Sequence, residues 1–103
     1  MKDLKATISE FVESQEFNKA LDLLNEQIEM HPDQIELLEQ RGDIFYNKQK
    51  FADALNDFNM ILKIDKDNKL ISSKVEMTRN ILKYQNLDIF ESTNLNLDPW
   101  LDE

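Results

Sequence analysis

The chain has no cysteine, one glycine, two prolines and one histidine in 103 residues, and each scarcity excludes something. Without cysteine there is no disulfide framework, thiolate metal site or thiol nucleophile. Little glycine and proline, with 41% hydrophobic residues, favours a helical chain over a β-rich or disordered one. No run approaches the roughly 18 apolar residues of a membrane span, and the first ten residues lack the apolar core of a signal peptide. We therefore expect one all-α, cytoplasmic domain.

Basic residues are missing from the end of the chain, because all 12 Lys and Arg lie at or before Lys83. The part up to Lys83 has a net charge of −4, and the part after it has −5, which together give the chain its −9. A negative surface repels phosphate backbones and anionic lipids. Neither nucleic acid nor a membrane is therefore an expected partner.

Apolar and small residues recur with a period of 34, which is typical of a helical repeat. The matched pairs are Leu4 and Leu38, Phe11 and Phe45, Phe17 and Phe51, Ala20 and Ala54, Leu21 and Leu55, Leu24 and Phe58, and Ile28 and Leu62. Apolar spacing predicts helices over about 2–14, 17–30, 33–48, 51–64 and 68–85. Polar turns separate them, and Pro32 suits the first turn of the third helix.

These residues resemble the tetratricopeptide-repeat (TPR) pattern, which has a small residue at position 8, aromatics at 11 and 17, and alanine at 20. The resemblance implies an α-α superhelix with repeats at 1–34 and 35–68 and a capping helix at 69–86. The change in composition after the capping helix predicts an acidic, aromatic C-terminal arm at 87–103. Gly42 fills the small-residue position of the second repeat. Ile8 departs from it in the first, so we expect looser helix packing there.

The C-terminal arm carries too many apolar groups for a solvated tail, because disordered segments are usually poor in aromatics. Its predicted docking residues are Phe90, Leu97, Trp100 and Leu101. The fifth predicted helix has a second apolar stripe that a simple cap does not need, at Leu70, Met77, Ile81 and Tyr84. We expect the arm to fold back so that Phe90 or Trp100 meets this stripe. The alternatives are a homodimer, in which the arm crosses to a second copy, and insertion of the arm into another protein.

Catalysis has little support in the sequence. The single histidine, His31, lies in a turn, and no nucleophile or metal ligand accompanies it. Carboxylates at helical spacing, such as Glu36 with Glu39 and Asp53 with Asp57, are expected on solvated faces. We therefore predict no enzyme activity, no catalytic residue, no cofactor and no metal.

The TPR resemblance also implies a concave groove lined by the first helix of each repeat. The residues at groove positions are Lys5, Ser9, Glu36, Glu39, Gln40, Asp43, Asn47, Lys74, Met77 and Ile81. Chaperone-binding members hold a peptide's terminal carboxylate with a five-residue clamp, of which only Lys5 and Lys74 match, so this ligand is not expected.

Three acids on one helix face, Glu36, Glu39 and Asp43, would complement a basic peptide, although an acidic protein has an acidic groove in any case. We expect a non-catalytic protein–protein interaction module that binds a peptide or helix in this groove or associates through its arm. The alternative is an adaptor whose own arm is the ligand of another protein.

Overall fold

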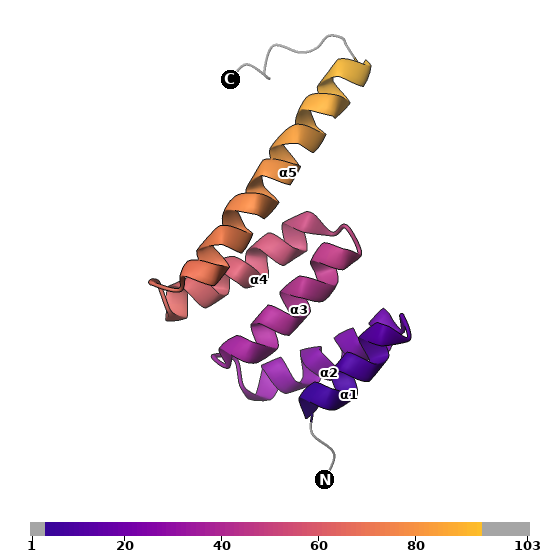
Figure 1. Cartoon of the computed structure of the whole chain (residues 1–103), viewed down its shortest axis with the longest axis vertical. Coiled ribbons are helices and arrows are strands. Elements are labelled where there is room, and N and C mark those ends of the chain that lie inside the picture. The colour runs from indigo at the N-terminus through magenta and orange to yellow at the C-terminus, as the bar shows by residue number, and fades with distance from the viewer. Residues whose placement is uncertain (1–3, 94–103) are drawn as a thin grey trace.

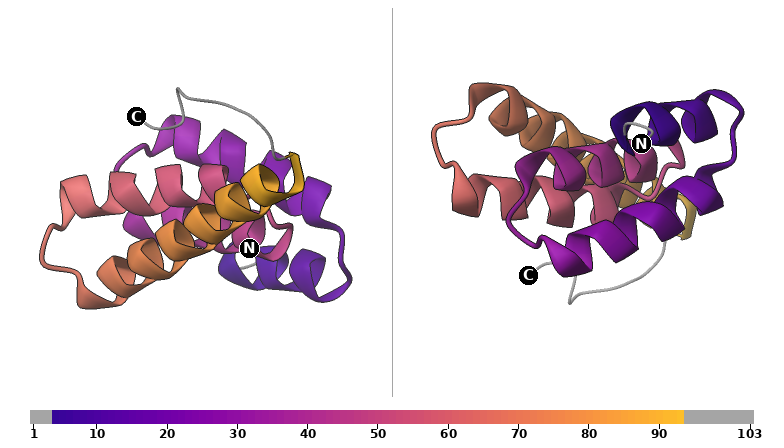
Figure 2. Two further views of the ribbon diagram at one scale, coloured as in Figure 1. Left: turned by 90° about the horizontal axis from the view of Figure 1, so that it is seen from above. Right: turned by 90° about the horizontal axis from the view of Figure 1, so that it is seen from below.

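The structure is a computed structural model that describes residues 4–93, with side chains described for residues 4–85. Over the described residues the chain forms helices and turns, without strands. The helices are α1 (Leu4–Glu13), α2 (Phe17–Met30), α3 (Ile35–Asn47), α4 (Phe51–Ile64) and α5 (Lys69–Thr93). Each runs back along the one before it, and the α1–α2 hairpin and α5 lie on opposite sides of the α3–α4 hairpin (Figures 1 and 2). The all-α prediction is confirmed.

The bounds of α2 and α4 agree with those predicted from apolar spacing, and α5 differs. It continues to Thr93, whereas the sequence predicted a helix to about residue 85 and an arm from residue 87. The backbone of Phe90 is therefore part of the same helix as Met77 and Ile81. A residue cannot fold back onto its own continuous helix, so the predicted contact of Phe90 with this stripe is wrong. Leu97, Trp100 and Leu101 lie outside the described residues.

The turns after α1 and α3 share one backbone geometry, 34 residues apart. Gln15 and Gln49 have φ values of 62° and 65°, in the left-handed region. The hydrogen bonds of the two turns are Gln15 N to Val12 O, Glu16 N to Phe11 O, Gln49 N to Tyr46 O and Lys50 N to Phe45 O. This is the Schellman helix ending, in which glycine usually takes the left-handed position. Glutamine takes it in both turns here.

Replacing Gln49 with glycine should therefore stabilise the fold. A left-handed conformation costs an L-residue about 1–2 kcal/mol, and the extra backbone entropy lost by glycine offsets about half of the gain. We expect Gln49→Gly to raise the free energy of unfolding in urea by about 0.5–1 kcal/mol. Gln49→Ala keeps the strained conformation and is the control. A glycine variant less stable than its alanine counterpart would contradict the left-handed geometry.

The hydrophobic core lies between successive helices and is densest where α3 packs on α4 and α4 on α5. Phe58 is almost fully buried, and a Cβ built at Gly42 would lie 2.6 Å from its Cε1 atom. The absence of a side chain at Gly42 thus lets α3 and α4 approach closely. At the equivalent place in the first hairpin stands Ile8, and α1 approaches α2 at fewer points. This is the looser packing that the sequence predicted.

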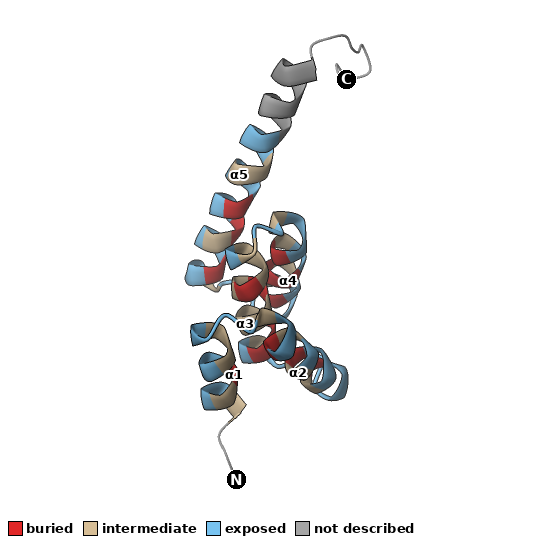
Figure 3. Cartoon of the chain, turned by 90° about the vertical axis from the view of Figure 1, so that its right-hand side faces the viewer, coloured by how far each residue is buried: buried red, intermediate tan, exposed pale blue. Residues whose placement is uncertain are grey.

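Helix α5 covers α4 with one side only. Ile71, Val75 and Thr78 are buried against the body, whereas Leu70, Met77 and Tyr84 are exposed. Figure 3 shows the same division, with buried residues on one side of α5 and exposed residues around the rest. The C-terminal part of this helix extends beyond α3 and α4 (Figure 1). The backbone N–H of Ile71 donates to Asn68 Oδ1 at 3.0 Å, so the Asn68 side chain caps the start of α5.

Candidate binding groove

Helix α3 lies at the centre of a groove that α1 and α5 flank. Three small cavities line up around it, with volumes of about 260, 210 and 180 Å³, and the Asp43 side chain lines all three. That side chain is 48% exposed, so water or a ligand can reach it. We call this surface the α3 groove. It brings residues from three separate helices to one carboxylate.

The α1 side of the α3 groove has an apolar floor and a polar rim. Ile8, Val12 and Ile44 line the 260 Å³ cavity, and its polar lining residues are Ser9, Glu13, Gln40, Asp43 and Asn47. Beside it, the 210 Å³ cavity is lined by charged and amide groups, namely Lys5, Glu36, Glu39, Gln40 and Asp43. An apolar floor beneath convergent polar groups is the usual form of a ligand site.

On the α5 side, Lys74 reaches across the α3 groove to α3. Its Nζ atom donates to Glu39 Oε2 at 3.0 Å and to Asp43 Oδ1 at 2.9 Å. The same ammonium lies 5.6 Å from the centre of the Phe58 ring, within the range of a cation–π contact. The remaining 180 Å³ cavity next to it is largely apolar and is lined by Asp43, Tyr46, Phe58, Lys74 and Met77.

These contacts keep Lys74 charged at physiological pH. Partial burial alone lowers its pKa, but hydrogen bonds to Asp43 and Glu39 outweigh that effect and raise the pKa above the ordinary value of about 10.5. A raised pKa in the folded state means that the ammonium contributes its full stabilisation below the unfolded value and loses it only as the pH rises through the folded one. The bridge between α3 and α5 therefore persists at neutral pH.

The residues predicted for the groove come together, with one exception. Nine of the ten line the three cavities, and Ile81 lines none of them. The acidic centre is less negative than the sequence indicated, because Lys74 pairs with both Glu39 and Asp43. Sequence reasoning missed the apolar floor at Ile8, Val12 and Ile44. The large residue at Ile8, where a small one was expected, was the signal that could have found it.

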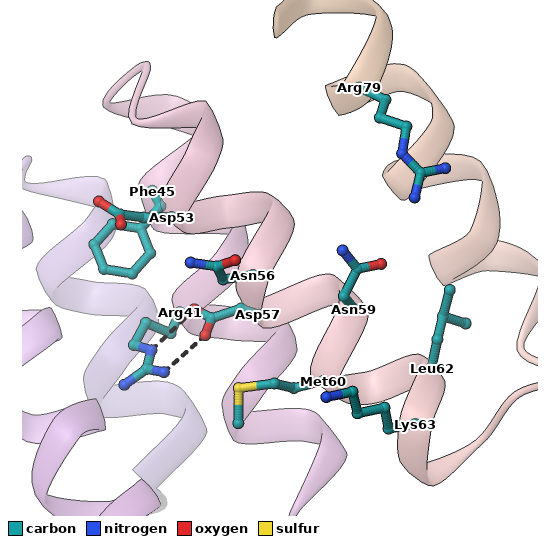
Figure 4. Close-up of a pocket in the computed structure, with 10 residues that line it drawn as sticks. All are labelled: Arg41, Phe45, Asp53, Asn56, Asp57, Asn59, Met60, Leu62, Lys63 and Arg79. Carbon is teal, nitrogen blue, oxygen red and sulfur yellow. Dashed lines mark hydrogen bonds and ion pairs between the residues drawn. The ribbon is translucent and has the colours of Figure 1, made fainter.

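A larger cavity, of about 950 Å³, lies along α4, with Arg41 at one side and Arg79 of α5 at the other (Figure 4). Arg41 is already committed there. It donates from Nε to Asp57 Oδ2 at 2.9 Å, from Nη2 to Asp57 Oδ1 at 2.7 Å and from Nη1 to Asn25 Oδ1 at 2.9 Å. This fork joins α3 to α4 and α2, which makes it a structural element rather than a ligand site.

Asp57 corrects one expectation from the sequence. It was assigned to a solvated face with Asp53, yet only 2% of it is exposed, while Asp53 does face water. A carboxylate buried in this way needs a partner, and the bidentate guanidinium of Arg41 supplies it. The hydrogen bond to Asp57 raises the pKa of Arg41 and outweighs the lowering caused by burial. The spacing of acids along α4 could not reveal a partner that lies on α3.

Within residues 4–85, no group of three or more His, Cys, Asp or Glu side chains is arranged to hold a metal ion. In the part of the chain that the structure describes, no helix has both the length and the apolar character needed to cross a membrane.

We found no match to a protein-family model, to a curated protein or to a solved structure. The functional interpretation of the α3 groove therefore rests on the geometry of the groove itself.

Proposed function

We propose that this chain is a non-catalytic protein–protein interaction module of the tetratricopeptide type, which binds a peptide or helix in the α3 groove. The observation that carries the proposal is the meeting of three cavities at Asp43. Apolar pockets lie on both sides of this carboxylate, toward α1 and toward α5. A ligand with two apolar side chains and a basic group between them would place one apolar side chain in each pocket and the basic group at Asp43. A cytoplasmic adaptor or assembly factor would use such a site.

The TPR interpretation is supported by the recurrence of backbone detail, and not only of residue types. Besides the two left-handed glutamines, the ends of α2 and α4 repeat after 34 residues. The backbone N–H of His31 donates to Gln27 O at 2.9 Å, and that of Asp65 donates to Ile61 O at 2.8 Å. Two hairpins with the same endings are the arrangement expected of a tandem repeat.

The charges of the α3 groove favour a basic group in the ligand. Glu13, Glu36, Glu39 and Asp43 line it against Lys5 and Lys74, which leaves an excess of negative charge. Lys74 already occupies one oxygen of Asp43, and the half-exposed carboxylate can accept from a second donor. Electrostatic complementarity of this kind sets specificity and orientation more than total affinity.

A displayed library of random peptides about ten residues long would test this proposal, since that length spans a groove of three helices. We expect selected peptides to be enriched in Arg or Lys flanked by apolar residues. Asp43→Asn should weaken their binding about 10- to 100-fold, because a charge-assisted hydrogen bond contributes roughly 1.5–3 kcal/mol. Fluorescence anisotropy of a labelled selected peptide gives the affinity.

Asp22→Asn is the matched control, because it removes the same charge from an exposed position on α2 that lines none of the three cavities. It should leave the affinity unchanged. Equal weakening by both substitutions would indicate a general charge effect and would remove the α3 groove as the site. Selection of peptides without basic residues would remove the charge argument.

A further inference from the structure

Among the residues that the structure describes, α5 is the last helix, and its exposed face is unusual for the end of a helical array. A terminal helix normally shows a polar outer face to water. Leu70 is 60% exposed, Met77 51% and Tyr84 66%, and the half-buried Ile81 lies between the last two. Their spacing of seven, four and three residues places them on one side of the helix. We call this row the α5 stripe. Exposed apolar rows of this kind usually mark a contact surface.

The other exposed side of α5 is polar, which shows that the stripe is not simply the place of a missing repeat. Ser72, Glu76, Arg79 and Lys83 are all exposed there. A following helix of an array would need apolar residues at these positions. The α5 stripe instead continues the α3 groove, because Met77 also lines the 180 Å³ cavity beside Lys74. Its occupant therefore approaches from the groove side.

We propose that residues 94–103 of the same chain cover the C-terminal half of the α5 stripe, with Trp100 packed against Tyr84 and Ile81. This segment, NLNLDPWLDE, supplies Leu95, Leu97, Trp100 and Leu101 as apolar groups. A tryptophan buries a large area and anchors a short segment well. The inference stands on its own, whether or not the α3 groove binds a peptide.

The length of the segment fits this placement. Tyr84 and Ile81 lie nine and twelve residues before Thr93, which is about 14 and 18 Å along a helix. Trp100 lies seven residues after Thr93 and can reach back at most about 23–25 Å. Leu70 is 23 residues before Thr93, or about 35 Å, which is beyond the reach of Trp100. The stripe therefore divides into a part within reach and a part outside it.

Charge and tethering favour this occupant over a second copy of the chain. Residues 94–103 carry three acids and no base, whereas residues 69–85 of α5 carry four bases and one acid in a chain that is otherwise acidic. Arg79 and Lys83 lie on the polar side of α5, away from the stripe, so this attraction acts along the helix as a whole and not through direct ion pairs. A short tether also gives the segment a local concentration of the order of millimolar, which exceeds that of free chains in ordinary solutions.

The single tryptophan makes the proposal directly measurable in the full chain, since all tryptophan fluorescence comes from position 100. We expect emission at short wavelength and protection from acrylamide, both unchanged across a broad dilution series. Tyr84→Asp should move the emission to longer wavelength and raise the quenching constant several-fold. Circular dichroism should show unchanged helix content, because the Tyr84 side chain is mostly in water.

Leu70→Asp is the matched control, with the same chemical change at a similarly exposed position of the α5 stripe that Trp100 cannot reach. It should behave as the unmodified chain does. Emission typical of water-exposed tryptophan in the unmodified chain would overturn the proposal. Protection of Trp100 from acrylamide that is the same in the Tyr84→Asp variant would also overturn it. Protection that disappears on dilution would assign the stripe to a second copy and would equally overturn it.

Discussion

Arg41→Met should lower the free energy of unfolding by about 3 kcal/mol, near the lower end of the range for breaking a buried ion pair by removing one partner. Asp57 would keep its charge in a site with almost no contact with water, and both of its hydrogen bonds from Arg41 would be lost. Part of the Arg41 side chain is exposed to solvent. In the variant, a water molecule can therefore reach Asp57 and limit the loss of stability. For a domain of this size the melting temperature should fall by about 10–20 °C.

The double variant Arg41→Met with Asp57→Leu distinguishes the contribution of the charge interaction from that of side-chain packing. Replacing both charges with apolar groups of similar size is often close to neutral, so the double variant should recover to within about 1 kcal/mol of the original stability. Asn25→Ala is a milder control, since it removes the third contact of Arg41 at an exposed site. Urea denaturation followed by circular dichroism measures all of them. An Arg41→Met variant as stable as the original chain would show that the pair does not join the helices.

Gly42→Ala should lower the free energy of unfolding by about 2 kcal/mol, even though alanine is the better helix former by about 1 kcal/mol. The new methyl group would meet the Phe58 ring at 2.6 Å, closer than carbon atoms approach in proteins. The Phe58 ring is almost fully buried, so it cannot shift away from the methyl group unless α4 moves with it. Overpacking therefore outweighs helix propensity.

The partner substitution Phe58→Leu tests the same contact from the opposite helix. Alone it should destabilise through the space it leaves. Combined with Gly42→Ala it should cost clearly less than the sum of the two single changes, because the smaller side chain makes room for the methyl group. A double-mutant cycle from thermal melts measures the coupling. Additive effects would place the clash elsewhere.

The helices were predictable because they depend on local information. Apolar spacing located α2 and α4. The single glycine, Gly42, was assigned to the small-residue position of the second repeat, and it does lie where α3 and α4 approach closely. The end of α5 was misplaced because a change in composition after Tyr84 was read as a change in structure. No glycine or proline interrupts residues 87–93, so nothing there ends the helix at that change.

Contacts between helices were not predictable, because they depend on which side chains meet across the fold. Glu39 and Asp43 were read as open acids, yet Lys74, more than 30 residues later, pairs with both. Asp57 was read as solvated, yet it is buried with Arg41. Nine of the ten groove positions did come together, because the faces of α1, α3 and α5 that carry them meet around Asp43. The ion-pair partner of each charged side chain could be identified only from the structure.

The loose attachment of α1 has a consequence for motion. Helices of this chain contact mainly their neighbours in sequence, so local segments can open without global unfolding. Amide protons of α1 should therefore exchange with solvent deuterium well before those of α3 and α4, as hydrogen-exchange mass spectrometry can measure. Equal protection of α1 and α4 would contradict this. Opening of α1 would take Ile8 and Val12 away from the floor of the α3 groove while Lys74 still joins α3 to α5, so the groove would lose one side and keep the other.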